Sequence, residues 1–412
     1  MLKKDPVPIY HVQKIPGPSL PKKEILMKRF IIFLIVFMLI PNISCANNDS
    51  ERIDSSAIIK KQEETFGIRD FLRDCERYAP DFINDLNIKN LFNNYVSGSF
   101  DNKGIFNKAG GLIKKGFTDV FKILLSIIVI VLIHSLLKAL TDDLENNSVS
   151  QIVYYAQYIM IVTIIMASFS EILDSIIESI DNMVGFTRSL VPLLITLMIY
   201  TGNITTSTVL EPVLLFIIEL IANIIKIGII PIVSLIMALI IVSKISNRVQ
   251  IQKISKFMKS SVVWTLGIVL TVFIGLVSLE GSLTSAIDGV TAKTAKAAIS
   301  SLIPVVGKVL GDGVDSVLGC GVILKNAVGV MGVIIIISIC LLPIIKLATF
   351  TIMYSVSSAI IEPLADEKIV KLLDEMSDVF KLLLAIICSV SALLIIGITL
   401  VIKISNSGMM YR

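Results

Sequence analysis

The sequence predicts an all-α protein, a polytopic transmembrane helical bundle, and two observations lead to that class. Apolar residues make up 54% of the 412 residues and charged residues only 17%, which is far more apolar than an ordinary soluble domain. The apolar residues also gather in long uncharged runs, and about 20 helical residues cross the ~30 Å hydrocarbon core of a bilayer. We therefore expect roughly eight or nine helical spans, separated by amphipathic helices that lie along the membrane surface.

The N-terminal 46 residues are expected to precede the folded protein. Residues 1–26 contain five prolines and no apolar run, so we interpret them as an upstream extension before a start at Met27. A basic beginning, an apolar stretch over 30–40 and small residues just before the end are typical of a secretory signal peptide, here 27–46, cleaved after Ala46. Cleavage would place the following residues outside the cytoplasm.

Two other interpretations of this leader stay open. A lipoprotein anchored at Cys45 is disfavoured because Asn42 stands three positions earlier, where a bulky apolar residue is expected. An uncleaved first span is disfavoured because eleven apolar residues are too few to cross a bilayer.

Residues 47–119 are mostly polar and are expected to form a small extracytoplasmic region with two short helices. Tyr78-Ala79-Pro80 separates the first helix from a second, predicted over 85–96. Four apolar residues recur at helical spacing and are predicted to form the buried face of the first helix: Ile68, Phe71, Leu72 and Cys75. No obvious disulfide partner accompanies Cys75 in this region.

Nine apolar stretches are candidate spans: 120–140, 152–170, 189–202, 209–226, 228–243, 262–280, 322–343, 346–363 and 382–402. The intervals 171–181, 244–259 and 365–381 are amphipathic. In 171–181, four acidic residues form one stripe that is typical of a solvated face: Glu171, Asp174, Glu178 and Asp181. The apolar side chains expected on the opposite face are Ile172, Ile176, Ile177 and Ile180. The basic interval 244–259 is expected in the cytoplasm, which requires five crossings before it.

A short pattern recurs at a fixed offset. Ser189-Leu190-Val191-Pro192 returns 112 positions later as Ser301-Leu302-Ile303-Pro304. Ile229-Ile230-Pro231 returns at the same offset as Leu341-Leu342-Pro343. Internal repeats are common in transporters and channels, and the four prolines, Pro192, Pro231, Pro304 and Pro343, are candidate hinges or re-entrant points. The predicted units are repeat A over 120–231, repeat B over 232–343, and a partial third repeat with the C-terminal span over 344–412.

Polar residues inside the predicted spans are candidates for a polar pathway. His134 and Lys138 lie on one face of the first span, and Glu219 and Asn223 lie near one face of the fourth. An ionisable group inside a bilayer is costly, so it marks a functional site by default. Structural explanations stay open, because Lys138 can extend to the membrane surface and Glu219 can pair with a lysine in its own helix.

The sequence contains no pattern typical of catalysis, cofactor binding or metal binding. Ser/His/Asp sets, HExxH and His/Cys metal spacings are absent, and the glycines over 307–321 do not match a phosphate-binding loop. Gly329 and Gly332 are instead typical of close helix packing. The net charge of +4 is spread along the chain, so nucleic-acid binding is not predicted. We therefore expect no enzyme and no cofactor, and the lipid bilayer as a partner.

These features together resemble one family. The signal peptide, the Tyr78-Ala79-Pro80 break, the Ser189–Pro192 segment, Thr201-Gly202-Asn203 and the amphipathic intervals are similar to the stage III sporulation protein AE family of endospore-forming bacteria. The resemblance covers the chain from Met27 onward. It rests on layout and short motifs, and it carries over no catalytic residue.

The resemblance implies a multi-pass protein of the mother-cell membrane that faces the engulfed forespore. It implies partners as well: other stage III sporulation membrane proteins, ring-forming proteins and an associated ATPase. The implied function is a component of a transport or channel complex that connects the two cells and supports forespore development.

Two alternative functions stay open. A stand-alone secondary transporter or permease would use the same repeats without partners. A non-conducting membrane scaffold for partner ring proteins would depend on residues 47–119 and on the surface loops, and not on the interior of the spans.

Overall fold

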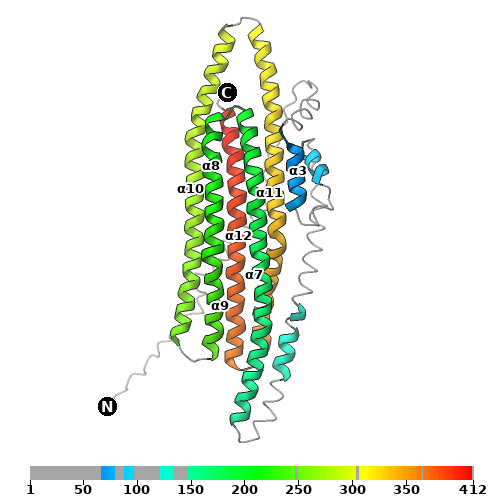
Figure 1. Ribbon diagram of the computed structural model, residues 1–412, viewed down its shortest axis with the longest axis vertical. Coiled ribbons are helices and arrows are strands. Elements are labelled where there is room, and N and C mark those ends of the chain that lie inside the picture. Colours follow the sequence, from blue (N-terminus) through cyan, green and yellow to red (C-terminus); the bar gives the residue numbers. More distant parts are fainter. Residues whose placement is uncertain are drawn as a thin grey trace, which may run out of the picture. The chain divides into compact units, whose positions relative to one another are not determined.

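The computed structural model consists of long helices packed side by side (Figure 1). The structure describes residues 66–78, 88–96, 121–123, 125–133, 147–245, 249–302, 306–363 and 365–410. All of them belong to one unit of the chain, which covers Ile53–Arg412. Every regular element in these ranges is helical, which confirms the all-α class predicted from the sequence.

Within the described ranges, five long rods run antiparallel to their neighbours in sequence (Figure 1). The rods are α7 (Asn147–Tyr200); the continuous α8 (Ile204–Asn223), π-helical η1 (Ile224–Ile229) and α9 (Ile230–Ile245); α10 (Val249–Leu302); α11 (Val306–Ile361); and α12 (Glu367–Met410). The last rod, α12, packs against all four others and lies at the centre of the bundle.

Each rod contains a segment that is long and apolar enough to cross a membrane. These segments are Tyr154–Tyr200, Ile204–Ile245, Ile251–Val290, Val317–Ile361 and Glu367–Asn406. A shorter apolar helix, Phe121–Ile133, falls in the first predicted span. The chain is thus a multi-pass helical membrane protein. At 1.5 Å per residue the long segments measure about 60–70 Å, roughly twice the hydrocarbon core.

The rods merge segments that the sequence analysis treated as separate. Residues 152–170, 171–181 and most of 189–202 all lie in α7, and 365–381 leads directly into the last apolar segment within α12. These two amphipathic intervals are continuous with the apolar segments beside them in the same helix. The expectation that they form separate helices along the membrane surface, between a larger number of shorter spans, was wrong. The physical reason is that α7 has no proline before Pro192, and an acidic stripe exposed on one side does not break a helix.

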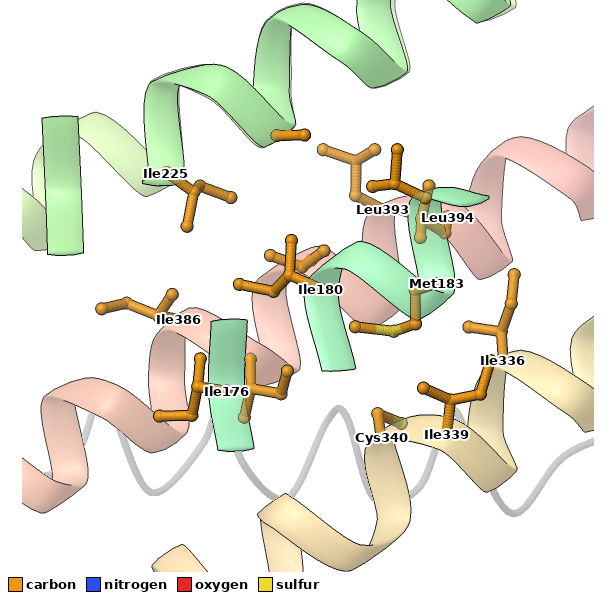
Figure 2. Close-up of a cluster of buried hydrophobic side chains, with 14 of the residues drawn as sticks. Ile176, Ile180, Met183, Ile225, Ile336, Ile339, Cys340, Ile386, Leu393 and Leu394 are labelled. Carbon is orange, nitrogen blue, oxygen red and sulfur yellow. The ribbon is translucent and has the colours of Figure 1, made fainter. Parts of the chain in front are cut away.

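Isoleucine and leucine fill the centre of the bundle, as Figure 2 shows for part of α7, η1, α11 and α12. The labelled side chains are all buried: Ile176, Ile180, Met183, Ile225, Ile336, Ile339, Cys340, Ile386, Leu393 and Leu394. Ile172, Ile176 and Ile180 are buried and Ile177 is partly buried opposite the exposed acidic stripe of α7, as the sequence predicts. In lipid, such close packing is a main force that holds helices together.

Two glycines let α11 approach its neighbours closely, which confirms the packing predicted for them. A Cβ atom at Gly329 would lie 2.2 Å from Cδ1 of Ile402 in α12. One at Gly332 would lie 2.4 Å from Cδ2 of Leu190 in α7. Small residues at such contacts allow helix backbones to come together in membranes.

Two short helices pack on the flank of the bundle. α3 (Ile68–Tyr78) contacts α7 and α11, and α5 (Ile88–Val96) contacts α11 and α3. The predicted buried face of α3 is correct, because Ile68, Phe71, Leu72 and Cys75 are all buried. The rings of Phe71 and Tyr78 lie 6.2 and 6.0 Å from the ring of Phe186 in α7.

Cys75 is a free thiol at this contact. Burial is the main cause that raises its pKa, and the neighbouring carboxylates of Asp74 and Glu76 raise the pKa further. The thiol is therefore neutral and poorly reactive in the folded protein.

Three of the four candidate hinge prolines lie within rods. Pro192 is inside α7, Pro343 is inside α11, and Pro231 is the second residue of α9, directly after η1. A π-helical turn ahead of a proline accommodates the missing backbone N–H. The borders of the predicted repeats fall inside continuous helices, so the duplication and the hinge role stay predictions.

Candidate functional site

The sharp turn between α7 and α8 organises one end of the bundle. Gly202 has φ 85°, a left-handed conformation that glycine adopts without steric cost. The N–H of Gly202 donates to the carbonyl of Ile199 at 2.9 Å, and that of Asn203 donates to the carbonyl of Met198 at 3.0 Å. This is the Schellman pattern that ends many helices. It holds Asn203 in a fixed, buried position.

A carboxylate from α10 caps the following helix. Oδ1 and Oδ2 of Asp288 accept hydrogen bonds from the backbone N–H groups of Thr205 and Thr206, both at 2.9 Å. These N–H groups belong to the first turn of α8, where helix backbone donors lack partners and negative charge is stabilised. Asp288 therefore joins α10 to the start of α8. Its side chain is buried, and the two backbone N–H groups of α8 satisfy its carboxylate oxygens.

Lys325 of α11 lies at the centre of this end and is fully buried, with 0% of its surface exposed. Its Nζ donates to Oγ of Ser405 at 2.5 Å and to Oδ1 of Asn406 at 2.8 Å. Nδ2 of Asn203 donates to the same Ser405 Oγ at 2.9 Å. One hydroxyl in α12 thus connects α11 to the α7–α8 turn. We call Asn203, Lys325, Ser405 and Asn406 the Lys325 cluster.

Among the described residues, the lysine of the cluster has no ionic partner. None of the carboxylates in the described ranges forms an ion pair with Lys325. A buried charge held only by neutral groups is expensive, and in membrane proteins such groups mark ion, proton or ligand sites by default. The described residues include no group of three or more His, Cys, Asp or Glu side chains that could hold a metal ion.

A second polar feature lies on the outside of the bundle. Lys346 of α11 pairs with Glu171 at 3.2 Å, and Lys226 of η1 pairs with Asp181 at 2.6 Å. Higher on α7, Arg188 pairs with Glu219 of α8. We call these six residues the α7 seam: Glu171, Asp181, Arg188, Glu219, Lys226 and Lys346. The seam extends the predicted acidic stripe into a row of interhelical ion pairs.

Two of the four predicted pathway residues, Glu219 and Asn223, lie within the described ranges. Glu219 and Asn223 line an open hollow on the surface, together with apolar neighbours such as Phe216 and Ile227. Glu219 pairs with Arg188 and not with the lysine in its own helix. Their role in a pathway stays a prediction. Ala46, His134, Lys138 and Pro304 lie outside the described residues.

The sequence analysis missed the Lys325 cluster. Lys325 stands inside the predicted span 322–343, and a lysine within a span is a signal that sequence alone provides. Its partners are 80 and 81 residues away, and no local pattern connects them. Asp288 escaped notice for the same reason.

Within the described residues, four long apolar rods around the central α12, with a buried lysine and an outer row of ion pairs, define the chain as a polytopic α-helical membrane protein. The model of the family described as stage III sporulation protein AE matches residues 86–405. The chain therefore belongs to the stage III sporulation protein AE family, and its role lies in sporulation.

The comparisons add one relative. The stage III sporulation protein AE of Bacillus subtilis (strain 168) is 28% identical over 291 residues, which cover 71% of this chain and 73% of that protein. No solved structure matches the chain. The matched region of the family includes α5, the first four rods and α12 as far as Ser405 of the Lys325 cluster.

Proposed function

We propose that the chain is a membrane-embedded component of a multiprotein transport or channel complex that connects the mother cell with the forespore. In this proposal it lies in the mother-cell membrane, works with other stage III sporulation proteins and an ATPase, and carries out no covalent chemistry. Membership of the sporulation family and the multi-pass fold support the setting.

The observation that carries the proposal is where the polar groups lie. The centre of the bundle at mid-height is apolar (Figure 2), whereas the α7 seam places ion pairs on the outside, with Arg188 and Glu219 56% and 44% exposed. A stand-alone permease needs a polar route through its own centre. Ion pairs on the outer surface of membrane-spanning helices favour a protein that completes its polar surfaces with partners.

Neutralising the seam tests this proposal. The double variant Arg188→Gln and Glu219→Gln removes one ion pair while keeping similar side-chain size. We expect normal amounts of membrane-inserted protein, but fewer heat-resistant spores and less passage of a small fluorescent solute between the two cells. Lys371→Gln with Glu367→Gln is the matched control, because this exposed pair lies within one helix. Unchanged spore counts and solute passage in the seam variant would remove the proposal.

The scaffold alternative makes a different prediction for the same variants. If the chain only anchors partner proteins, substitutions on α3 would reduce spore formation while the seam variant would not. A purified protein that moves solute into vesicles without partners would instead favour the stand-alone transporter.

A further inference from the structure

Opposite flanks of the bundle have opposite polarity. On α10, residues 260–279 contain no charged side chain, and at 1.5 Å per residue this stretch spans about 30 Å, the thickness of the hydrocarbon core. One stripe of it is exposed, which we call the α10 stripe: Val263, Trp264, Ile268, Val272, Leu276 and Leu279. In Figure 1, α10 lies on the opposite side of the central α12 from α3.

The middle of the α10 stripe lies at the same depth as the upper part of the α7 seam. A narrow internal crevice is lined by Thr187, Ile218 and Phe273 together, along with residues of α12. Thr187 and Ile218 are the chain neighbours of Arg188 and Glu219. Phe273 follows Val272 of the stripe. The Arg188–Glu219 ion pair and the exposed Val272 therefore occupy one level of the bundle.

The polar helix α3 also lies at this level. It packs on Phe186, the residue before Thr187, through Phe71 and Tyr78. Its outer face presents Arg73 and Asp70, which are 78% and 76% exposed. Two neighbouring faces at this depth are thus charged, while the α10 face is apolar.

Neither lipid alone nor water alone can surround the bundle at the depth of Arg188 and Val272 without a large cost. Lipid on every side would desolvate the exposed charges of Arg188, Glu219 and Arg73, and a charge in a bilayer centre costs several kcal/mol. Water on every side would leave the α10 stripe as a long exposed apolar surface. Resting on the proposed function, we infer that the α10 stripe faces lipid acyl chains, while the upper α7 seam and α3 face an aqueous path inside the complex.

Thiol accessibility in intact membranes tests the inference. Asn223→Cys places a thiol in the hollow beside Glu219, and Val272→Cys places one on the α10 stripe, which is 53% exposed. The full-length variants are treated with a membrane-impermeant maleimide before and after solubilisation in detergent. The unsubstituted chain is the blank for labelling of its own five cysteines; of the four in the described residues, Cys75, Cys320 and Cys340 are buried and Cys388 is half-buried.

We expect Asn223→Cys to be labelled in membranes at least about tenfold faster than Val272→Cys, because lipid excludes the charged reagent. Detergent should bring the two rates together, because the lipid that shields the α10 stripe from the reagent is then removed. Equal labelling in membranes would overturn the inference, since this level would then lie in water. Protection of both residues would overturn it too, because the seam would then be in a dry contact.

The labelling test is separable from the proposed function. It reports which faces of the protein meet water and lipid, and it needs no transport. If the seam is labelled but its neutral variants sporulate normally, the proposed transport role fails while the orientation stands.

Discussion

Two buried lysines at opposite ends of the bundle are held in different ways. Lys244 in α9 is 3% exposed, and its Nζ lies 2.7 Å from Oε1 of Glu375 in α12, which is 24% exposed. Lys325 in α11 is 0% exposed, and within the described residues its Nζ donates hydrogen bonds to the neutral Ser405 and Asn406 and pairs with no carboxylate. One end of the bundle thus compensates its buried charge, and the other does not.

The difference teaches which end is specialised. A buried ammonium group that pairs with a partly exposed carboxylate is an ion pair that needs no functional explanation. A buried ammonium without a carboxylate reduces stability relative to an apolar side chain of similar volume. We therefore interpret Lys244 as structural and the Lys325 cluster as functional, and four predictions test that contrast.

The largest effect is expected for Lys325→Met. The substitution keeps a long side chain and removes the uncompensated charge, so the melting temperature in detergent should stay equal or rise. Spore formation should fall about tenfold or more, because the proposed site loses its cation. The matched variant, Lys244→Met, should do the reverse, with spores formed and stability reduced. Normal sporulation by Lys325→Met would contradict the contrast.

Ser405→Ala should destabilise the protein strongly. The alanine leaves the ammonium of Lys325 and the amide of Asn203 without their shared acceptor, and hydrogen bonds to charged groups contribute about 1.5–3 kcal/mol. Denaturant unfolding in detergent would measure the loss. The double variant with Lys325→Met should recover part of it, because the charge that needs the hydroxyl is gone. Additive losses would show that the two residues are not coupled.

Asp288→Asn should have an intermediate effect. Asparagine keeps the size of the side chain but loses the negative charge at the start of α8, a change of about 1–2 kcal/mol in a buried cap. The same unfolding measurement applies, with Asp378→Asn as an exposed control. A loss no larger than that of the control would mean that the cap is not electrostatic.

Glu375→Gln should have the smallest effect. It removes the negative charge beside Lys244, but the amide oxygen of the glutamine can still accept the hydrogen bond from Nζ, so we expect a loss of about 1 kcal/mol. The loss should shrink further at high salt, since exposed charges are screened. Equal stabilities at low and high salt, together with a large loss, would place Glu375 in drier surroundings than its exposure indicates.

Sequence patterns predicted local features well. The buried face of α3, the acidic stripe opposite Ile172, Ile176 and Ile180, and the close packing at Gly329 and Gly332 each follow from the spacing of neighbours along one helix. The all-α membrane class follows from composition. Each of these depends on residues a few positions apart, which one helical turn brings to the same side.

The partition into spans was less predictable. Hydropathy marks the apolar stretches of α7 as two spans because Glu171 to Asp181 interrupt them, yet the helix continues through that interval. Hydropathy averaged over a window of residues measures only how polar the segment is. Whether the helix continues depends on its backbone hydrogen bonds, and acidic side chains on one face leave these intact.

By itself, the sequence determined that this chain is helical, enters membranes and exposes an acidic stripe, because these properties depend on composition and local periodicity. Only the tertiary structure decided that Lys325 contacts Ser405 and Asn406, that Asp288 caps α8, and that Arg188 and Val272 share one level on different faces. The physical reason is that these residues lie roughly 80 positions apart in the chain, and the packing of long rods against a central helix decides which of them come to lie near one another.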